Sequence, residues 1–493
     1  MWGRKTETPQ PRTPWHLSEP LLYLSEIDPW SNGDAFEGTL VLGATGSGKS
    51  SGSGRALAFS FLRAGFGGLV LTAKPDERAL WESYCREAGR EGDLLVFGPE
   101  RALRFNFIDH ELRRPGVGAG LTENIVNLLS TVLEVAERGA GGQGGREDEG
   151  YWRRAMRQHM RNLVDLLVLG KGSLSIPDLY RLVVSAPTST EEARSPEWKR
   201  DSFCYECLKL ADERDKSPRQ RKDYEIVADY LMLEFPALSE KTRSVIVSTF
   251  TSMIDVLNRG ILRDLFCGET NVTPEVVESG KVLAIDLPVK EFSEVGLFAQ
   301  VLWKYVFQRS VERRDTAANP RPVFFWADEA QNFVTSYDMQ FQTTARSSRV
   351  ATVLLSQNLS NFYAALGGGE RGKAEADSLL ANLNTKIFHA NGDPVTNEWA
   401  STLVGRTRQF FVNGGNSYQT VDMLSFPWMR SLPSINAGIS ESFEFELQPS
   451  VFTALRRGGF ANHGEVDGIV FQGGRRFRAN GRSWLRRTFR QRD

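Results

Sequence analysis

A glycine-rich segment near the N-terminus combines glycines, a lysine and a hydroxyl residue at a spacing suited to binding phosphate. Residues 43–50 read Gly-Ala-Thr-Gly-Ser-Gly-Lys-Ser and fit the pattern G-x-x-x-x-G-K-[ST] at every fixed position. In such a loop the glycines let backbone N–H groups turn toward phosphate oxygens, Lys49 reaches the β- and γ-phosphates, and the Ser50 hydroxyl ligates Mg²⁺. The predicted nucleotide-binding residues are Gly43, Ala44, Thr45, Gly46, Ser47, Gly48, Lys49, Ser50 and Ser51.

The residues on either side of this segment decide between two interpretations of it. A glycine-rich stretch can also be an ordinary turn. Here the apolar residues 40–42 precede it as an expected strand, and residues 56–62 follow with the apolar character of a helix. Strand, loop and helix in this order are the context that a phosphate-binding loop requires, so the sequence favours a nucleoside triphosphate site over a turn.

Two carboxylates follow an apolar strand in the second half of the chain. Residues 323–327 read Val-Phe-Phe-Trp-Ala, and Asp328 and Glu329 come directly after them. Any buried strand that reaches the surface can end in two acidic residues. Combined with the glycine-rich loop, the pair fits the second half of an ATPase site, in which Asp328 holds the Mg²⁺ shell and Glu329 polarises the attacking water. The sequence thus predicts ATP and Mg²⁺ as cofactors, with Ser50 and Asp328 as the metal ligands.

Two further polar residues lie close to the apolar segment 351–356. Gln357 follows it, and its amide is suited to sensing the γ-phosphate or orienting water. Arg346 precedes it, where a helix is expected, and is there either a surface cation or a catalytic group. If subunits form a ring, Arg346 can enter a neighbour's nucleotide site and stabilise the transition state, a contribution of about 10³–10⁵ in rate.

Short apolar segments alternate with helical segments over much of the chain, which indicates an α/β fold. Near-continuous apolar runs of this kind are typical of strands that are buried on both faces of a parallel sheet. They span residues 68–74, 94–97, 282–286, 323–328, 351–356 and 385–389. The sequence therefore predicts a mostly parallel central sheet with helices packed around it.

The sequence changes character between residues 121 and 279, where helical periodicity replaces the strand-like runs. We expect a mostly α-helical domain inserted at 121–279 in a nucleotide-binding motor formed by 36–120 and 280–493, with 1–35 as an irregular N-terminal arm. Within the insertion, Gly139–Gly145 and Ser185–Arg200 are expected to be loops.

Composition bounds the partners that this chain can have. Its 493 residues are 41% hydrophobic and 25% charged, which is ordinary for a globular protein of two or three domains. The formal net charge of −1 means that nucleic-acid binding requires a local patch or an assembled ring. From Arg456 onward, ten arginines stand against three acidic residues, in a tail that is either a solvated surface or a contact with nucleic acid or acidic lipid.

The cysteines do not favour a zinc site. Only Cys204 and Cys207 have the spacing of a ligand pair, and neither a second such pair nor a pair of nearby histidines accompanies them. We expect them to be ordinary thiols on a helix in a reduced protein.

Five segments together point to a known family: Leu42–Ser50, Leu71–Glu77, Phe105–Asp109, Trp326–Gln331 and Ala345–Gln357. In this order they resemble the type IV secretion coupling proteins, the TraG/TraD-like members of the HerA/FtsK class, and the resemblance extends from about Leu21 to the C-terminus. It implies a hexameric ATPase that pumps DNA in conjugation, with a RecA-like P-loop motor interrupted by an all-α domain. It also implies that Lys49 and Ser50 bind nucleotide and Mg²⁺, that Asp328 and Glu329 form the Walker B pair, that Gln357 is the sensor and that Arg346 acts in trans.

The sequence departs from that family in two places. The usual N-terminal pair of transmembrane helices is not found, and no run of about 18 apolar residues occurs, so we expect a cytoplasmic protein that is at most peripheral at the inner face of the cell membrane. The family's Asp-Pro-Lys-like turn reads Thr-Ala-Lys-Pro-Asp at residues 72–76, which moves the acidic residue to the far side of Lys74.

Three functions are compatible with these features. The leading hypothesis is an ATP-driven DNA translocase that delivers DNA, or a relaxase bound to DNA, to a conjugation or type IV secretion machinery. The second is an adaptor that recruits relaxase or other secretion-system proteins and uses ATP binding as an assembly switch. The third is a HerA-like translocase in DNA processing or defence, although the residues before Gly43 are few for the β-barrel that typically precedes a HerA motor. The strandedness of the DNA and the number of subunits in the ring stay open.

Overall fold

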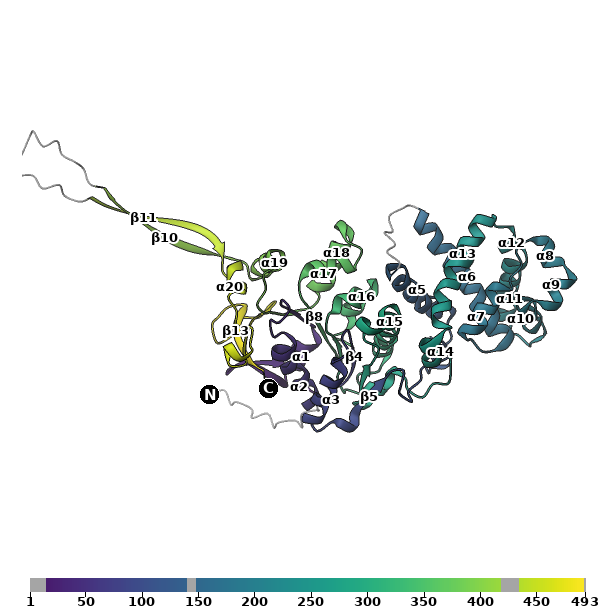
Figure 1. The fold of residues 1–493 in the computed structure, drawn as a ribbon, viewed down its shortest axis with the longest axis horizontal. Coiled ribbons are helices and arrows are strands. Elements are labelled where there is room, and N and C mark those ends of the chain that lie inside the picture. Colours follow the sequence, from purple (N-terminus) through teal and green to yellow (C-terminus); the bar gives the residue numbers. More distant parts are fainter. Residues whose placement is uncertain (1–14, 140–147, 418–433, 492–493) are drawn as a thin grey trace, which may run out of the picture.

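The structure is a computed structural model that describes residues 15–139, 148–417 and 434–491. Figure 1 shows a central α/β region with a block of helices on one side and a long two-stranded ribbon on the other. The α/β region contains the segments that carry the predicted chemistry, and the other two regions project from it.

Nine strands form the central sheet, in the order β13-β12-β9-β3-β8-β7-β4-β6-β5. Every pairing from β9 to β5 in this order is parallel, whereas β12 and β13 extend one edge of the sheet with antiparallel pairings. The strands are β3 (Thr39–Leu42), β4 (Gly67–Leu71), β5 (Leu94–Phe97), β6 (Val282–Ile285), β7 (Val323–Ala327), β8 (Val350–Ser356), β9 (Thr385–Phe388), β12 (Glu465–Gln472) and β13 (Trp484–Arg490). The predicted α/β fold with a mostly parallel sheet is therefore confirmed.

Side chains of the sheet alternate between two hydrophobic cores, because successive residues on a strand point to opposite faces. On β3, Leu40 and Leu42 pack into one core and Val41 packs into the other. Helix α15 (Val289–Arg313) covers the first face, and α2 (Arg55–Arg63) and α3 (Glu77–Glu87) cover the second. Burial on both faces explains why these strands are nearly continuous apolar runs.

The described residues between β5 and β6 form helices and turns without a strand. Most of these helices build the block on one side of the α/β region (Figure 1), and α5 packs against α15 of that region. They are α4 (Phe107–Arg113), α5 (Thr122–Gly139), α6 (Asp148–Lys171), α7 (Ile176–Val184), α8 (Thr190–Arg194), α9 (Pro196–Asp201), α10 (Phe203–Glu213), α11 (Pro218–Asp229), α12 (Phe235–Ala237), α13 (Glu240–Leu257) and α14 (Gly260–Phe266). We retain the division into 1–35, 36–120 with 280–493, and 121–279 as a proposal.

The N-terminal residues form a small folded unit, which corrects the prediction of an irregular arm. Residues 1–14 of that arm lie outside the described residues. From Pro20 on, β1 (Pro20–Ser25) and β2 (Asp28–Ser31) pair as a hairpin and lead into the short helix α1 (Asn32–Phe36). Trp30 and Phe36 are fully buried in the same hydrophobic core as the apolar residues of α2, and this burial holds the N-terminal unit on the α/β region.

The stretch Ser185–Arg200 contains the short helix α8 and all but the last residue of α9, so the prediction of a loop there is wrong. Ser189 and Ser195 cap these helices with side-chain oxygens that accept backbone N–H groups of the first turn. Such caps stabilise a helix by about 1 kcal/mol each, and here they override the charged, proline-containing composition. All but the first residue of the predicted loop Gly139–Gly145 lie outside the described residues.

The ribbon consists of β10 (Arg406–Ser417) and β11 (Ser434–Phe445), which pair in antiparallel register and extend away from the α/β region (Figure 1). The remaining helices after β7 are α16 (Ser336–Thr344), α17 (Leu359–Ala365), α18 (Gly369–Ala381), α19 (Pro394–Val404) and α20 (Pro449–Thr453). In the described part of the chain, no single helix is both long and apolar enough to span a membrane. Helices α13 and α14, which meet at 77°, reach that standard only when taken together.

Candidate nucleotide-binding and catalytic site

The predicted chemical groups meet at the carboxyl ends of four adjacent strands. Strand β8 lies between β3 and β7, and β7 pairs with β4 on its other side. The loops that follow these strands contribute the glycine-rich segment, the two carboxylates, Gln357 and a turn that includes Lys74. In open parallel sheets this edge is the usual place for a ligand site, because the loops of neighbouring strands come together there.

The backbone of the glycine-rich loop depends on its glycines at two positions. Gly46 and Gly48 have φ angles of 72° and 81°, which residues with a side chain rarely adopt. At Gly48 a Cβ atom would also lie 2.5 Å from the side chain of Val466 on β12. The loop then continues into a single turn of π-helix at Ser50–Gly54 before α2 begins. The sequence therefore folds here into the strand, loop and helix that the motif predicts.

The predicted metal ligands are in direct contact. The Ser50 Oγ donates a hydrogen bond to Asp328 Oδ2 over 2.6 Å, and Asp328 is buried with only 6% of its surface exposed. A hydroxyl and a carboxylate are the oxygen ligands that Mg²⁺ takes when substrate phosphates and water complete its shell. These two residues therefore fit the cation predicted from the sequence. Elsewhere in the described residues, no group of three His, Cys, Asp or Glu side chains is arranged to hold a metal ion.

Glu329 lies at the centre of the charged groups. Its Oε1 is 3.9 Å from Lys49 Nζ and 3.2 Å from Lys74 Nζ, and its Oε2 accepts a hydrogen bond of 2.9 Å from Gln331 Nε2. The backbone of Glu329 is left-handed, with φ 49°. Such strain in a residue other than glycine costs about 1–3 kcal/mol and is concentrated at functional sites.

The charge state of Glu329 follows from these contacts. Burial acts to raise the pKa of this carboxyl, but the hydrogen bond from Gln331 and the charges of Lys49 and Lys74 lower it overall. For Lys74, burial acts to lower the pKa, and the charges of Asp328 and Glu329 raise it above the usual value. The site therefore combines an ionised Glu329 carboxylate with a protonated Lys74 at neutral pH.

The structure brings Gln357 to Glu329. The amide Nε2 of Gln357 donates to both carboxylate oxygens over 3.3 Å, and the Ser356 hydroxyl supports the neighbouring Gln331 by donating to its Oε1 over 2.7 Å. Gln331 is a residue that sequence reasoning did not assign to the site. Its position two residues after Glu329 was the available signal.

Arg346 is not part of the site in its own chain. It forms an ion pair of 3.2 Å with Glu37, and its side chain is 64% exposed. Both predicted alternatives, a surface cation and a group that acts on a neighbouring subunit, remain compatible with that position.

Two buried residues near the loop were missed by the sequence analysis. Glu77 Oε2 accepts a hydrogen bond from the Ala73 N–H over 2.8 Å, and burial together with the charge of Asp328 raises the pKa of Glu77 to about 8. His389 Nε2 accepts the Ser53 hydroxyl at 2.6 Å, while its Nδ1 donates to the Asp467 carbonyl at 2.8 Å. Burial lowers the pKa of His389 to about 4, which makes the ring neutral and supports this assignment.

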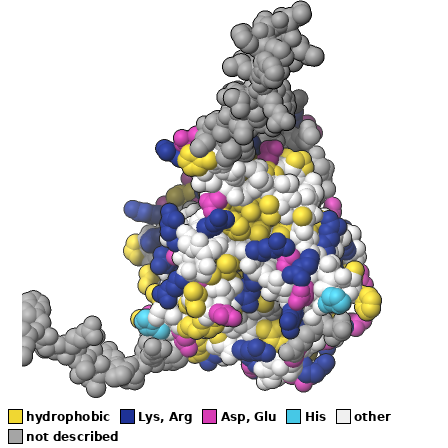
Figure 2. Space-filling model, turned by 90° about the vertical axis from the view of Figure 1, so that its left-hand side faces the viewer, with side chains coloured by type: hydrophobic (Ala, Val, Ile, Leu, Met, Phe, Trp, Pro, Cys, Tyr) yellow, Lys and Arg dark blue, Asp and Glu magenta, His cyan; other side chains and the backbone are white. Residues whose placement is uncertain are grey.

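The C-terminal arginines are largely committed to contacts within the chain. Asp467 on β12 accepts hydrogen bonds from Arg456 and Arg486, and Arg482 pairs with Glu446. Gln491 Nε2 donates to Ser51 Oγ, so the tail also reaches the end of the predicted nucleotide-binding segment. On the ribbon side of the molecule, Figure 2 shows Lys and Arg side chains interspersed with acidic and hydrophobic ones rather than gathered in one patch. Any strongly basic surface must therefore come from another face or from assembly.

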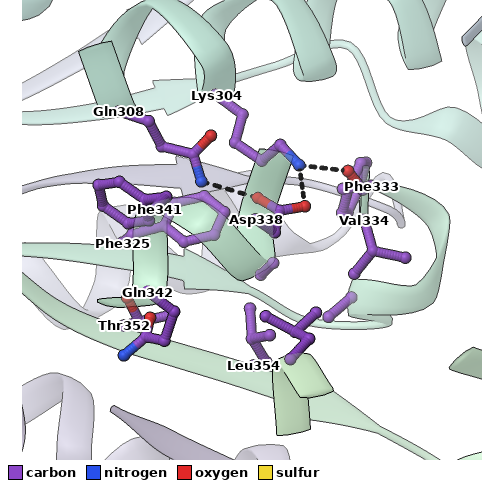
Figure 3. A pocket seen from close by; sticks show the side chains of 13 residues that line it. Lys304, Gln308, Phe325, Phe333, Val334, Asp338, Phe341, Gln342, Thr352 and Leu354 are labelled. Carbon is purple, nitrogen blue, oxygen red and sulfur yellow. Dashed lines mark hydrogen bonds and ion pairs between the residues drawn. The ribbon is translucent and has the colours of Figure 1, made fainter. Parts of the chain in front are cut away.

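A second set of charged residues lies behind the site, between α15, α16 and the sheet (Figure 3). Lys304 is 1% exposed and donates to the Phe333 carbonyl over 2.7 Å, to the Thr335 hydroxyl over 3.2 Å and to Asp338. Asp338 also accepts the Thr335 N–H at 2.6 Å and the Gln308 amide at 2.7 Å. This network fixes the segment that leads from Glu329 to α16.

The comparisons with known proteins agree with this fold. A family described as "TraM recognition site of TraD and TraG" matches residues 322–422, which include Asp328, Glu329 and Gln357. The chain is similar in structure to the unbound bacterial conjugative coupling protein TrwBdeltaN70, with 16% sequence identity, a TM-score of 0.61, and coverage of 97% of this chain and 91% of that one.

Two nucleotide complexes of TrwB give comparable results. The complex with the non-hydrolysable ATP analogue ADPNP has 15% identity, a TM-score of 0.61, and coverage of 98% and 91% of the two chains. The complex with ADP and Mg²⁺ has 15% identity, a TM-score of 0.57, and coverage of 94% and 88%. No curated protein sequence matches the chain. The fold class predicted from the sequence, a P-loop α/β fold with inserted helices, and the resemblance to the coupling proteins are confirmed.

Proposed function

We propose that this chain is an ATP-driven DNA translocase of the coupling-protein kind, which delivers DNA or a relaxase–DNA complex to a conjugation or type IV secretion machinery. The observation that carries the proposal is the convergence of Lys49, Ser50, Asp328 and Glu329 at one edge of the sheet. The match of residues 322–422 to the TraD and TraG family and the likeness of the fold to TrwB support DNA transfer as the task.

The site residues divide the work of ATP hydrolysis among them. The backbone N–H groups of residues 43–48 and the Lys49 ammonium bind the phosphates, and Ser50 and Asp328 hold Mg²⁺. When bound, Mg²⁺ supplies positive charge to the β- and γ-phosphate oxygens. Glu329 orients the attacking water and receives the proton of that water. Gln357 donates to both oxygens of the Glu329 carboxylate and keeps this carboxylate directed toward the water.

Assembly into a ring, hexameric in this proposal, completes the site. A single chain offers no arginine at Glu329 within the described residues, whereas Arg346 is exposed and paired only with Glu37 among the ion pairs described. A neighbouring subunit would bring such an arginine to the transferred phosphoryl group. A ring would also gather cations around a pore, which a chain of net charge −1 requires in order to hold a polyanion.

The experiment that tests this function measures DNA retention from low to moderate salt, with single- and double-stranded DNA of several sequences. A translocase must grip the phosphate backbone without reading the bases, so we expect binding that falls steeply with salt and depends little on sequence. Assembled protein that retains neither form at low salt would contradict the proposal and favour the adaptor that recruits relaxase or secretion proteins. A neighbouring relaxase gene would support transfer, and a neighbouring nuclease gene would support DNA processing or defence instead.

A further inference from the structure

Lys74 is the cation closest to the water-activating carboxylate. Its Nζ is 3.2 Å from Glu329 Oε1, compared with 3.9 Å for Lys49 Nζ. Among the described residues, these two lysines are the only cations in ion-pair contact with Glu329. Their surroundings differ, because Lys49 is buried in the phosphate loop whereas the Lys74 side chain is 32% exposed. Lys74 therefore has room to move and Lys49 has little.

The turn that carries Lys74 is held in a fixed position. The fully buried Gln300 of α15 bonds to both the N–H and the carbonyl of Thr72, at 3.3 and 3.0 Å. The Thr72 hydroxyl donates to the Ile285 carbonyl over 2.7 Å, and Glu77 accepts the Ala73 N–H. Contacts of this number on a short turn preorganise its backbone, so the lysine side chain is flexible on a rigid base.

The binding of a triphosphate would change the partners of both lysines. Lys49 belongs to the phosphate loop and pairs with the β- and γ-phosphates in that state. The γ-phosphate carries more negative charge than the single Glu329 carboxylate, and a lysine presents three donors on a long flexible stem. A cation 3.2 Å from Glu329 lies within reach of the water and phosphoryl group that Glu329 serves.

We propose that Lys74 is a γ-phosphate-responsive residue: it pairs with Glu329 when no γ-phosphate is present and moves to the γ-phosphate when ATP binds. Its departure frees the Glu329 carboxylate to accept the proton of the attacking water, and its arrival adds positive charge where negative charge develops in the transition state. The inference rests on the proposed ATPase function and adds to it a cation within the same chain that distinguishes ATP from ADP.

The test compares Lys74→Met with Lys74→Arg and with a matched control, Lys281→Met. Lys281 has a similar exposure of 35% and a comparable ion pair of 3.0 Å to Asp93, but it lies just before β6, at the end of that strand away from the site. For each variant we would measure kcat and KM for ATP, the affinities for ADP and for a non-hydrolysable ATP analogue, and the melting temperature.

We expect Lys74→Met to lower kcat by about 10²-fold, the effect of removing one preorganised group from a charged transition state. Its affinity for the ATP analogue should fall about tenfold, while its affinity for ADP and its melting temperature stay at the parent values. Lys74→Arg should recover part of both losses, and Lys281→Met should behave as the parent does.

Two results would overturn the inference. One is a Lys74→Met protein that keeps the parent kcat and the parent ratio of analogue to ADP affinity. The other is an equal loss of affinity for both nucleotides, which would make Lys74 a residue of the loop's structure only. A parent protein that binds nucleotide without hydrolysing it would contradict the proposed function instead, and the affinity ratio would still decide the role of Lys74.

Discussion

Two sets of lysines and carboxylates lie on either side of the segment that leaves β7, and they differ in how completely they are paired. In the nucleotide site, Lys49 and Lys74 approach Glu329 to 3.9 and 3.2 Å, and Lys74 is one third exposed. Behind the segment, Lys304 and Asp338 are nearly inaccessible and make hydrogen bonds to backbone and side chains in several directions (Figure 3).

The difference teaches which buried charges are available for chemistry. Asp338 accepts bonds from Lys304, Gln308 and the backbone of Thr335, so none of its oxygens is left for a ligand. Glu329 is held loosely by amide and ammonium groups on a strained backbone, and a water or phosphate can replace those partners. The same residue types thus give a rigid support in one place and an exchangeable site in the other.

The largest expected effect is on ATP hydrolysis at the nucleotide site, where Lys49 and Lys74 approach Glu329. Glu329→Gln should retain nucleotide binding and reduce ATP turnover to background, because the substitution removes only the group that activates water. Lys49→Ala should weaken binding itself, because it removes the cation that faces the phosphates. Equilibrium binding of a labelled ATP analogue, measured beside turnover, separates the two defects, and equal binding losses in both variants would contradict the assignment.

The next effect concerns Arg346, which this chain does not bring to its own site. Arg346→Ala should lower ATP turnover by about 10³-fold or more if a neighbour depends on it. Mixing Arg346→Ala subunits with Glu329→Gln subunits should restore part of the activity, since some interfaces then combine an intact site with an intact arginine. Mixed rings verified by mass that stay inactive at every ratio would argue against action in trans.

The buried pair Lys304 and Asp338 should affect the stability of the fold rather than ATP hydrolysis. Lys304→Met leaves Asp338 buried without its cation, and we expect a loss of about 3–5 kcal/mol in the free energy of unfolding, measured with urea. Arg371→Met is the matched control, because it breaks an exposed ion pair of 3.2 Å with Glu375 and should change stability by less than about 1 kcal/mol. A Lys304→Met protein as stable as the control would show that the network does not support the fold.

A smaller effect, on the pH dependence of stability, is expected from Glu77. The pKa of this carboxyl is raised from 4.5 to about 8, so the folded state holds the proton more tightly than the unfolded chain does. Its contribution to stability is therefore complete below about pH 4.5 and is lost as the pH rises toward 8. Glu77→Gln has no proton to lose. Without nucleotide and Mg²⁺, its melting temperature should match the parent at about pH 5 and exceed it by about 2 °C or more near pH 9. A constant difference across this range would contradict the raised pKa.

The sequence predicted the motif residues of the nucleotide site better than the contacts around them. Gly43–Ser50 and the pair Asp328 and Glu329 are found because each role demands particular residue types at fixed spacing. The strands between them are found because burial on both faces requires continuous apolar runs.

What the sequence could not predict depends on contacts between distant segments. The pairing of Lys74 with Glu329 joins the loops that follow the adjacent strands β4 and β7, which are far apart along the chain, and the Lys304 network depends on how α15 lies on the sheet. Strand β12 is buried along nearly all of its length, whereas the edge strand β13 mixes apolar residues with three arginines, and the arginine content of the C-terminal segment suggested a solvated tail. The helices at Ser185–Arg200 follow from local serine caps that charge and proline content concealed.

The measurement that tests the central claim most directly is the ATP turnover of the assembled protein with and without DNA, at low salt, beside the Glu329→Gln variant. We expect DNA to raise the turnover of the parent, because a bound polyanion orders the subunit interfaces of the ring. The variant should bind DNA equally well and hydrolyse nothing above background. A parent whose turnover does not respond to either single- or double-stranded DNA, or a Glu329→Gln protein that hydrolyses ATP at the parent rate, would contradict the account.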